Sequence, residues 1–107
     1  MKKFHQRESG ERGWFIGDFD KAVYKTTALE AAFQHNFKGE RSEAHYHKIA
    51  TEISLITSGM VKVNGEIFTA GQGCIFEPGD VCKCEYLEDT TTMVVKVPGP
   101  MNDKYYV

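Results

Sequence analysis

Turn-forming residues divide this chain of 107 residues into short segments, and their spacing limits the folds open to it. Asn64-Gly65 stands between two alternating segments, and both residues tolerate the positive φ angles of a type I′ hairpin turn. Further turn signals occupy residues 71–73 and 78–80. Short strands separated by such turns are typical of a β-sandwich or a β-barrel. The sequence therefore predicts an all-β domain.

The boundaries of the expected strands follow from alternation and from these turns. We expect one domain over residues 1–107, with an N-terminal extension at 1–12 and a C-terminal tail at 99–107. Residues 31–38 are predicted as a strand, although Ala, Leu and Glu just before and within them favour a helix. The expected strands lie at residues 14–17, 31–38, 45–47, 52–57, 60–63, 66–68, 74–77, 81–87 and 92–97.

Two histidines and one glutamate form the clearest chemical pattern in the sequence. Alternate side chains of a strand share a face, so His45 and His47 should point to the same side. Glu52 follows after a short kink and opens the next alternating segment, so that its carboxylate can join the two imidazoles. Two imidazoles and one carboxylate are sufficient to bind a divalent transition metal. Two strand histidines that only make local hydrogen bonds are the simpler alternative.

The spacing Gly-x5-His-x-His-x4-Glu-x6-Gly resembles the first signature motif of the cupin superfamily. Gly39, His45, His47, Glu52 and Gly59 fill all five fixed positions of that motif. The resemblance implies a double-stranded β-helix, which is a jelly-roll barrel, with the two histidines and the glutamate at a metal site inside it. It also implies a divalent transition metal, and iron, zinc, manganese and nickel all remain open.

The second motif of the same superfamily is matched only in part. Gly71 and Gly79 agree with it, whereas Glu77 replaces the proline, Cys82 the fourth ligand histidine and Tyr86 the asparagine. The resemblance therefore implies that Cys82 occupies the position of a fourth metal ligand. Because the residue type differs there, the identity of the metal and the activity stay open.

Alternation along residues 81–87 indicates which side chains face the interior. Cys82, Cys84 and Tyr86 share one face, and Lys83 and Glu85 share the other. Charged side chains are costly to bury, so the cysteines and the tyrosine should face inward and line a pocket.

Three roles remain open for Cys82. As a thiolate it would complete a tetrahedral set with two histidines and a glutamate, which suits zinc. As a bystander it would leave a site of two histidines and one carboxylate with open positions, as in non-haem Fe(II) oxygenases. In the third reading the site holds no metal, and Cys82 and Cys84 line a small apolar cavity.

Charge and cysteine content exclude several functions. The net charge is −2, from 13 basic and 15 acidic residues, which gives no electrostatic reason to expect nucleic acid or membrane partners. Three cysteines are an odd number, and Cys82 and Cys84 are too close along a strand for an easy bridge, so we expect reduced thiols. The basic N-terminus has no apolar stretch behind it. We therefore expect a cytoplasmic protein.

The pattern supports two hypotheses of function. In the first, a metal enzyme acts on a small oxygen-bearing metabolite, and the resemblance implies dioxygenase-like or sugar-isomerase-like chemistry. In the second, a non-catalytic module binds a small ligand or a metal. No catalytic residue is assigned, because Glu77 is the only further candidate base and no arginine cluster is present.

Two expectations concern surfaces. His35 lies between two phenylalanines and is predicted to be a packed or interface residue rather than a ligand. A small open jelly roll exposes strand edges, and the cupin resemblance implies that a second copy covers them, so we expect a homodimer that uses residues 14–19.

Overall fold

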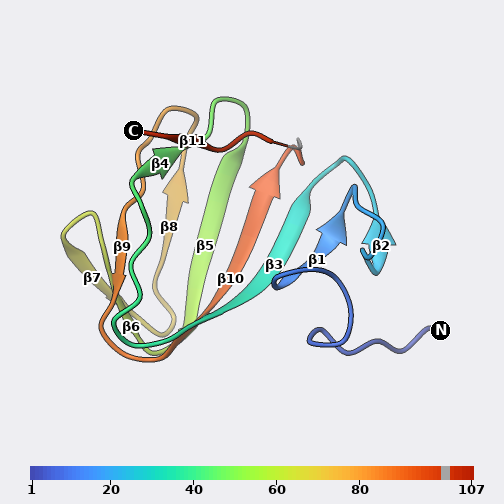
Figure 1. Cartoon of the computed structure of the whole chain (residues 1–107), viewed down its shortest axis with the longest axis horizontal. Coiled ribbons are helices and arrows are strands. Elements are labelled where there is room, and N and C mark those ends of the chain that lie inside the picture. Colours follow the sequence, from blue (N-terminus) through green and yellow to red (C-terminus); the bar gives the residue numbers. More distant parts are fainter. Residues whose placement is uncertain (100–101) are drawn as a thin grey trace.

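The computed structural model describes residues 1–99 and 102–107 as two β-layers that face each other (Figure 1). The larger layer is a six-stranded sheet of order β2-β1-β3-β10-β5-β8. β1 and β2 are parallel, and all other neighbours in this sheet are antiparallel. The bounds are β1 Trp14–Gly17, β2 Tyr24–Lys25, β3 Glu30–Asn36, β5 Thr51–Ser58, β8 Gly73–Phe76 and β10 Thr90–Val97.

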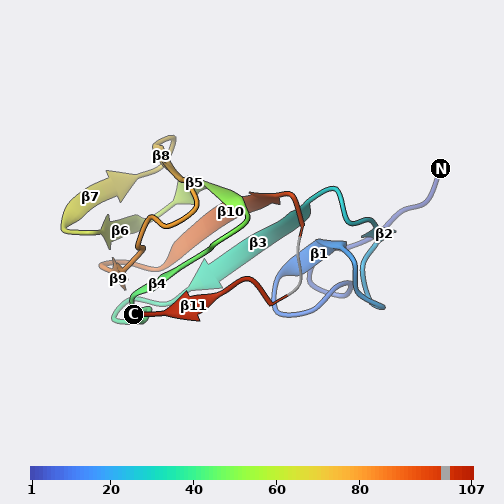
Figure 2. The ribbon, with the colours of Figure 1, turned by 90° about the horizontal axis from the view of Figure 1, so that it is seen from above.

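The smaller layer is assembled from two short sheets. One has the order β7-β6-β9, with β6 Met60–Val63, β7 Glu66–Thr69 and β9 Cys84–Tyr86. The other pairs β4 His45–Tyr46 with β11 Tyr105–Tyr106. Two isolated bridges, Arg41 to Glu85 and His45 to Cys82, join the two short sheets into one layer. Figure 2 shows β4, β6, β7, β9 and β11 on the side opposite β3 and β10.

The all-β prediction is confirmed, and the two layers of the jelly roll are not closed into a barrel. No helix occurs in residues 1–99 or 102–107, and none of this part could therefore span a membrane as a helix. The strand ladders leave the two layers as separate sheets and do not close them into a barrel. The physical reason is the shortness of β4, β9 and β11, since two or three paired residues cannot continue a ladder around a closed surface.

The core lies between the two layers. Its buried residues come from β5, β6, β8 and the segment before β9, and are Ile56, Val61, Val63, Phe76 and Cys82. Each fully buried aliphatic or aromatic side chain stabilises the fold by about 1.5–3 kcal/mol. Cys84 and Tyr86 pack against this cluster, and Lys83 is exposed on the opposite face. The predicted inward face of 82, 84 and 86 is therefore confirmed.

The predicted hairpin is also confirmed, and a motif glycine is explained. Asn64 and Gly65 have φ values of 50° and 84° between β6 and β7, as a type I′ turn requires. Gly59 has a φ of 91°, and a Cβ atom placed there would clash with the Asp89 carbonyl oxygen. Only glycine fits this tight approach between β5 and β10.

Three features differ most from the predictions. The strand expected at 81–87 is reduced to Cys84–Tyr86, because Cys82 makes only a single bridge, with His45. Two-residue strands that the sequence did not signal appear at Tyr24–Lys25 and Tyr105–Tyr106. The second of these lies in the expected C-terminal tail, where β11 pairs with β4. Residues 100–101 of that tail lie outside the described residues.

Candidate metal centre

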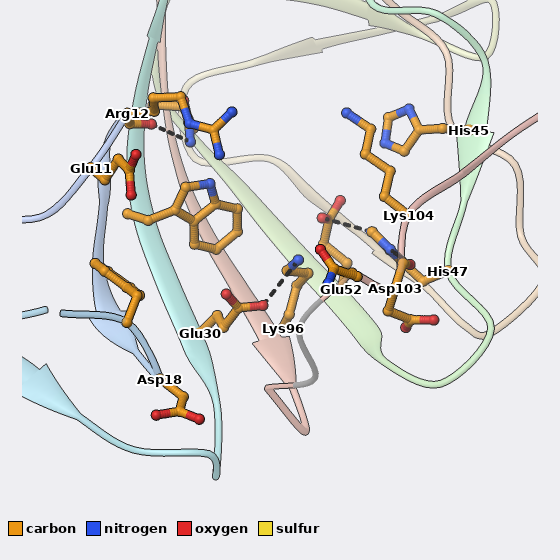
Figure 3. Close-up of a pocket in the computed structure, with 14 residues that line it drawn as sticks. Glu11, Arg12, Asp18, Glu30, His45, His47, Glu52, Lys96, Asp103 and Lys104 are labelled. Carbon is orange, nitrogen blue, oxygen red and sulfur yellow. Dashed lines mark hydrogen bonds and ion pairs between the residues drawn. The ribbon is translucent and has the colours of Figure 1, made fainter. Parts of the chain in front are cut away.

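His45, His47 and Glu52 line one cavity of about 520 Å³ between the two layers (Figure 3). His45 belongs to β4, His47 is the first residue after β4, and Glu52 lies near the start of β5. The two imidazole rings are 5.9 Å apart between their centroids and meet at 73°. The structure thus brings the three predicted ligands to the same cavity.

Backbone carbonyl groups fix the tautomers of both histidines. His47 Nδ1 lies 2.6 Å from the Asp103 carbonyl oxygen, and His45 Nδ1 lies 2.9 Å from the Glu43 carbonyl oxygen. A carbonyl oxygen can only accept, so Nδ1 carries the proton and donates it in each ring. Nε2 of each ring therefore keeps its lone pair unless a second proton binds. Metal-ligating histidines are held in this way in proteins.

Glu52 provides the carboxylate next to these rings. Its Oε1 lies 3.2 Å from His47 Nε2, and the side chains of Glu52 and His47 are only 14% and 7% exposed. The hydrogen bond to Glu52 raises the pKa of His47 above its ordinary value, against the opposing effect of burial. Because Nδ1 is already a donor, the contact with Glu52 needs a proton on Nε2. A metal ion would displace that proton.

His45 has the opposite electrostatic environment. Burial lowers its pKa, and the positive charge of Lys104 lowers it further, whereas the hydrogen bond to Glu43 acts in the other direction. The neutral imidazole, which is the form that binds metals, is thus favoured at this position.

The donor set fits a divalent transition metal, although the side chains do not yet converge on one point. Within residues 1–99 and 102–107, no three His, Cys, Asp or Glu side chains are grouped closely enough to hold an ion as they stand. His47 and Glu52 are already in contact. His45 carries the correct tautomer and faces the same cavity, so ligation requires its imidazole to turn toward the other two groups.

Cys82 lies directly opposite His45. Their backbones exchange hydrogen bonds of 3.1 Å and 2.8 Å, so both side chains are on the same face of the layer. Cys82 lines a second cavity of about 280 Å³ that also has His45 and Glu52 in its wall. Cys84 and Tyr86, both predicted to line the pocket, are in the same wall.

Mutual contact and burial shift the pKa values of the thiols in this second cavity. Cys82 Sγ lies 3.6 Å from Cys84 Sγ, and this contact, together with burial, raises the pKa of Cys82 far above that of a free thiol. The same contact lowers the pKa of Cys84, and burial raises the pKa of Cys74 to about 11. Burial also raises the pKa of Tyr86. Without a metal, Cys82 is therefore a neutral thiol in the cavity wall rather than a thiolate.

Asp103 is a structural member of the site that sequence reasoning missed. Its carboxylate accepts the backbone N–H groups of Lys48, Ile49 and Ala50 at 3.0, 3.0 and 2.9 Å, and the residue is only 3% exposed. Burial acts to raise its pKa, but the three N–H donors, together with the charge of His47, lower it overall. Asp103 thus fixes the loop between His47 and Glu52, and its carbonyl orients His47.

Three charged side chains from neighbouring strands line the larger cavity, and the sequence did not predict this arrangement either. Lys96 of β10 pairs in register with Glu30 of β3 on one side and Glu52 of β5 on the other. Its ammonium lies 3.1 Å from Glu30 Oε1, without alignment for a hydrogen bond, and 4.8 Å from the ring centre of Trp14. The sequence signal for this arrangement is weak: Lys96 falls on the same face of its strand as the buried residues Thr92 and Val94.

Two further candidates lie away from the cavities. Glu77 is exposed, and its N–H donates to Asp80 within a turn. His35 is exposed on β3, and its ring packs at 5.1 Å from that of Phe37. Neither residue lines either cavity.

Comparisons with known proteins identify the fold. No family model matches the chain, and no curated protein matches it in sequence. Among solved structures, it is similar to a double-stranded β-helix protein from Klebsiella pneumoniae, with a TM-score of 0.69, 22% identity, and 79% of each chain covered.

Two other similar structures are described as enzymes. One is a sugar phosphate isomerase of the cupin superfamily from Silicibacter pomeroyi, with a TM-score of 0.61, 20% identity, and 75% of this chain and 57% of that chain covered. The other is an acetylacetone dioxygenase from Acinetobacter johnsonii, with a TM-score of 0.58, 17% identity, and 66% of this chain and 52% of that chain covered. The chain therefore has the double-stranded β-helix fold of the cupins, and the resemblance of its motif is confirmed at the level of the fold.

Proposed function

We propose that this cupin-fold chain binds a divalent transition metal through Nε2 of His45, Nε2 of His47 and the carboxylate of Glu52, with a small oxygen-bearing ligand beside it. The observation that supports this most is the pair of Nδ1–H donors to backbone carbonyls, which leaves both Nε2 atoms for a metal. A bound metal would act as a Lewis acid toward an oxygen of the ligand.

Other residues of the chain would position the ligands, shape the cavity and supply a fourth ligand. Asp103 holds the loop that carries the ligands, so that His47 and Glu52 enter the cavity together. The buried side chains of Ile56, Val61 and Phe76 make part of the wall of the second cavity apolar. Cys82 takes the fourth position only if it loses its proton, and that would favour zinc over iron, manganese or nickel.

Two outcomes are compatible with such a site. Proteins with this fold include a sugar phosphate isomerase and an acetylacetone dioxygenase, so isomerase-like and dioxygenase-like reactions are the first to test. A binding module that captures a small ligand without turnover is the alternative. Reduced thiols at 74, 82 and 84 favour a cytoplasmic location for either function.

The test measures metal binding by titration calorimetry on protein freed of metal. His45→Gln and Glu52→Gln should each weaken Ni²⁺ or Zn²⁺ binding by more than about 100-fold, because loss of a second-sphere partner alone costs about 10- to 100-fold. His35→Gln is the matched control, since that imidazole lies outside both cavities. Equal affinity in wild type and in both site variants would refute the proposal. Turnover assays on the loaded protein then separate an enzyme from a binding module.

A further inference from the structure

Two lysines project into the cavity of the proposed metal site from segments far apart in the sequence. Lys96 comes from the inner face of β10, and its side chain is 13% exposed. Lys104 precedes β11 in the C-terminal segment and lines both cavities. Figure 3 shows the Lys104 ammonium beside the His45 ring and the Lys96 ammonium near Glu52. Each proposed histidine ligand thus has an ammonium group in its neighbourhood.

The placement of these charges bears directly on the metal site. Lys96 and Lys104 line the same cavity as His45 and His47, and Lys96 is the register neighbour of Glu52. An ammonium group that disfavours a proton on an imidazole also disfavours a metal dication bound to it. The lysines therefore weaken the binding of a metal ion on its own.

The carboxylates near the metal site offset this repulsion only in part, because Glu30 pairs with Lys96 but not with Lys104. The Glu30 carboxylate lies against Lys96, Glu52 is engaged by His47, and the Asp103 carboxylate accepts three backbone N–H groups. Two further acids, Glu11 and Asp18, are in the wall of the larger cavity. Among the described residues, no salt bridge engages the Lys104 ammonium, which lies 5.4 Å from the centre of the Tyr106 ring.

We propose that Lys96 and Lys104 bind an oxyanion group of the ligand, so that the metal and a small organic anion bind with positive cooperativity. The inference rests on the proposed function and names its ligand class: a small molecule with a carboxylate or a phosphate group. An anion placed between the metal and the ammonium groups converts their mutual repulsion into two attractions. Ammonium–oxyanion hydrogen bonds are charge-assisted and stronger than neutral ones.

The two lysines have different roles in this arrangement. Glu30 and Trp14 hold Lys96 in place, so little side-chain freedom is lost when it binds an anion. Lys104 is exposed and belongs to the segment that Asp103 anchors beside His47. It can approach an anion that enters from solvent. The site would thus be complete only when the C-terminal segment is docked.

The experiment measures the Ni²⁺ affinity of metal-free protein at about pH 7.5 by calorimetry, alone and with saturating glycolate, inorganic phosphate or ethylene glycol. Complexation of Ni²⁺ by each additive in solution is subtracted. Linkage requires that the anion and the metal strengthen each other equally, and typical couplings are about 5- to 150-fold. We expect glycolate or phosphate to tighten Ni²⁺ binding within that range and neutral ethylene glycol to leave it unchanged. The more effective anion distinguishes a carboxylate ligand from a phosphate ligand.

Variants assign the coupling to the lysines. Lys104→Met should tighten the binding of Ni²⁺ alone and reduce the coupling to the anion. The double variant Glu30→Gln, Lys96→Met should do the same, and it avoids an unpaired carboxylate at 30. Lys83→Met, on the exposed outer face, is the control and should behave as wild type.

The outcomes separate this inference from the proposed function. Absence of Ni²⁺ binding in wild type contradicts the proposed function, and the inference with it. Ni²⁺ binding that neither oxyanion strengthens, or coupling that persists in Lys104→Met and in the double variant, overturns the inference alone.

Discussion

Replacing Asp103 by Asn tests whether the C-terminal segment holds the metal-site loop. Oδ1 accepts the N–H of Lys48, and Oδ2 accepts those of Ile49 and Ala50. An amide keeps one acceptor oxygen and directs N–H groups at the remaining donors, so one or two of these three backbone N–H groups lose their partner. A lost hydrogen bond to a charged group costs about 1.5–3 kcal/mol. We expect Asp103→Asn to lower the free energy of unfolding by about 2–4 kcal/mol.

The same change should weaken the metal site. When the loop shifts, the Asp103 carbonyl that orients His47 moves with it, and loss of such a second-sphere contact reduces metal affinity about 10- to 100-fold. Urea denaturation of the metal-free protein and Ni²⁺ calorimetry measure the two effects. Asp80→Asn is the control, because Asp80 accepts a single N–H in an exposed turn, and it should lose much less stability. If Asp103→Asn loses less than about 1 kcal/mol and binds Ni²⁺ within about twofold of wild type, the anchoring role is refuted.

Three further predictions concern pH, backbone conformation and assembly. Because the pKa of His47 is raised, its pair with Glu52 stabilises the metal-free fold below about pH 6.5, and this contribution is lost as the pH rises through the raised pKa. Metal affinity increases over the same rise in pH. If the melting temperatures of wild type and Glu52→Gln differ by the same amount at every pH, this prediction is contradicted. Gly59→Ala should lower the free energy of unfolding by at least about 3 kcal/mol in urea denaturation, and Gly39→Ala by about 1–2 kcal/mol. Both glycines have φ above 90°, but only at Gly59 would an added Cβ atom meet a backbone carbonyl oxygen. Equal losses in the two variants would count against that reasoning. We expect a homodimer in light scattering at about micromolar concentration, and a monomer there would rule it out.

The fold places the segment predicted to form the dimer interface partly inside the molecule. Residues 14–19 were expected to form it, but β1 lies inside the larger sheet and Trp14 lines the cavity. Exposed apolar residues lie instead on the outer face of β5 and β8, at Ile53, Leu55 and Ile75. Both surfaces are therefore candidates for the dimer interface.

The parts of the fold that the sequence predicted are those encoded by local patterns. The hairpin at Asn64-Gly65 depends on two adjacent residues, and the inward face of 82, 84 and 86 depends on alternation within one strand. His45, His47 and Glu52 are close in the chain, so their shared cavity follows from strand geometry and one short loop. Such short-range features can be read without knowledge of the tertiary structure.

The missed parts depend on contacts between distant segments. Asp103 reaches the loop at 48–50 across more than 50 residues, and the polar segment around it gives no strand signal before it pairs with β4. The partners of Lys96 are set by the register of three strands, which alternation along one strand does not determine. The lengths of β4 and β9 also depend on their neighbours in the fold, so alternation within the segment 81–87 alone did not predict them.

The most direct test of the metal site is an anomalous-scattering measurement on a crystal of the zinc-loaded protein. We predict a zinc peak in the larger cavity, about 2.0–2.2 Å from Nε2 of His45, Nε2 of His47 and an oxygen of Glu52. A sulfur at about 2.3 Å would add Cys82 to the ligands. Zinc bound at another place, or a fully loaded solution that yields no peak beside these three side chains, would contradict the proposed site.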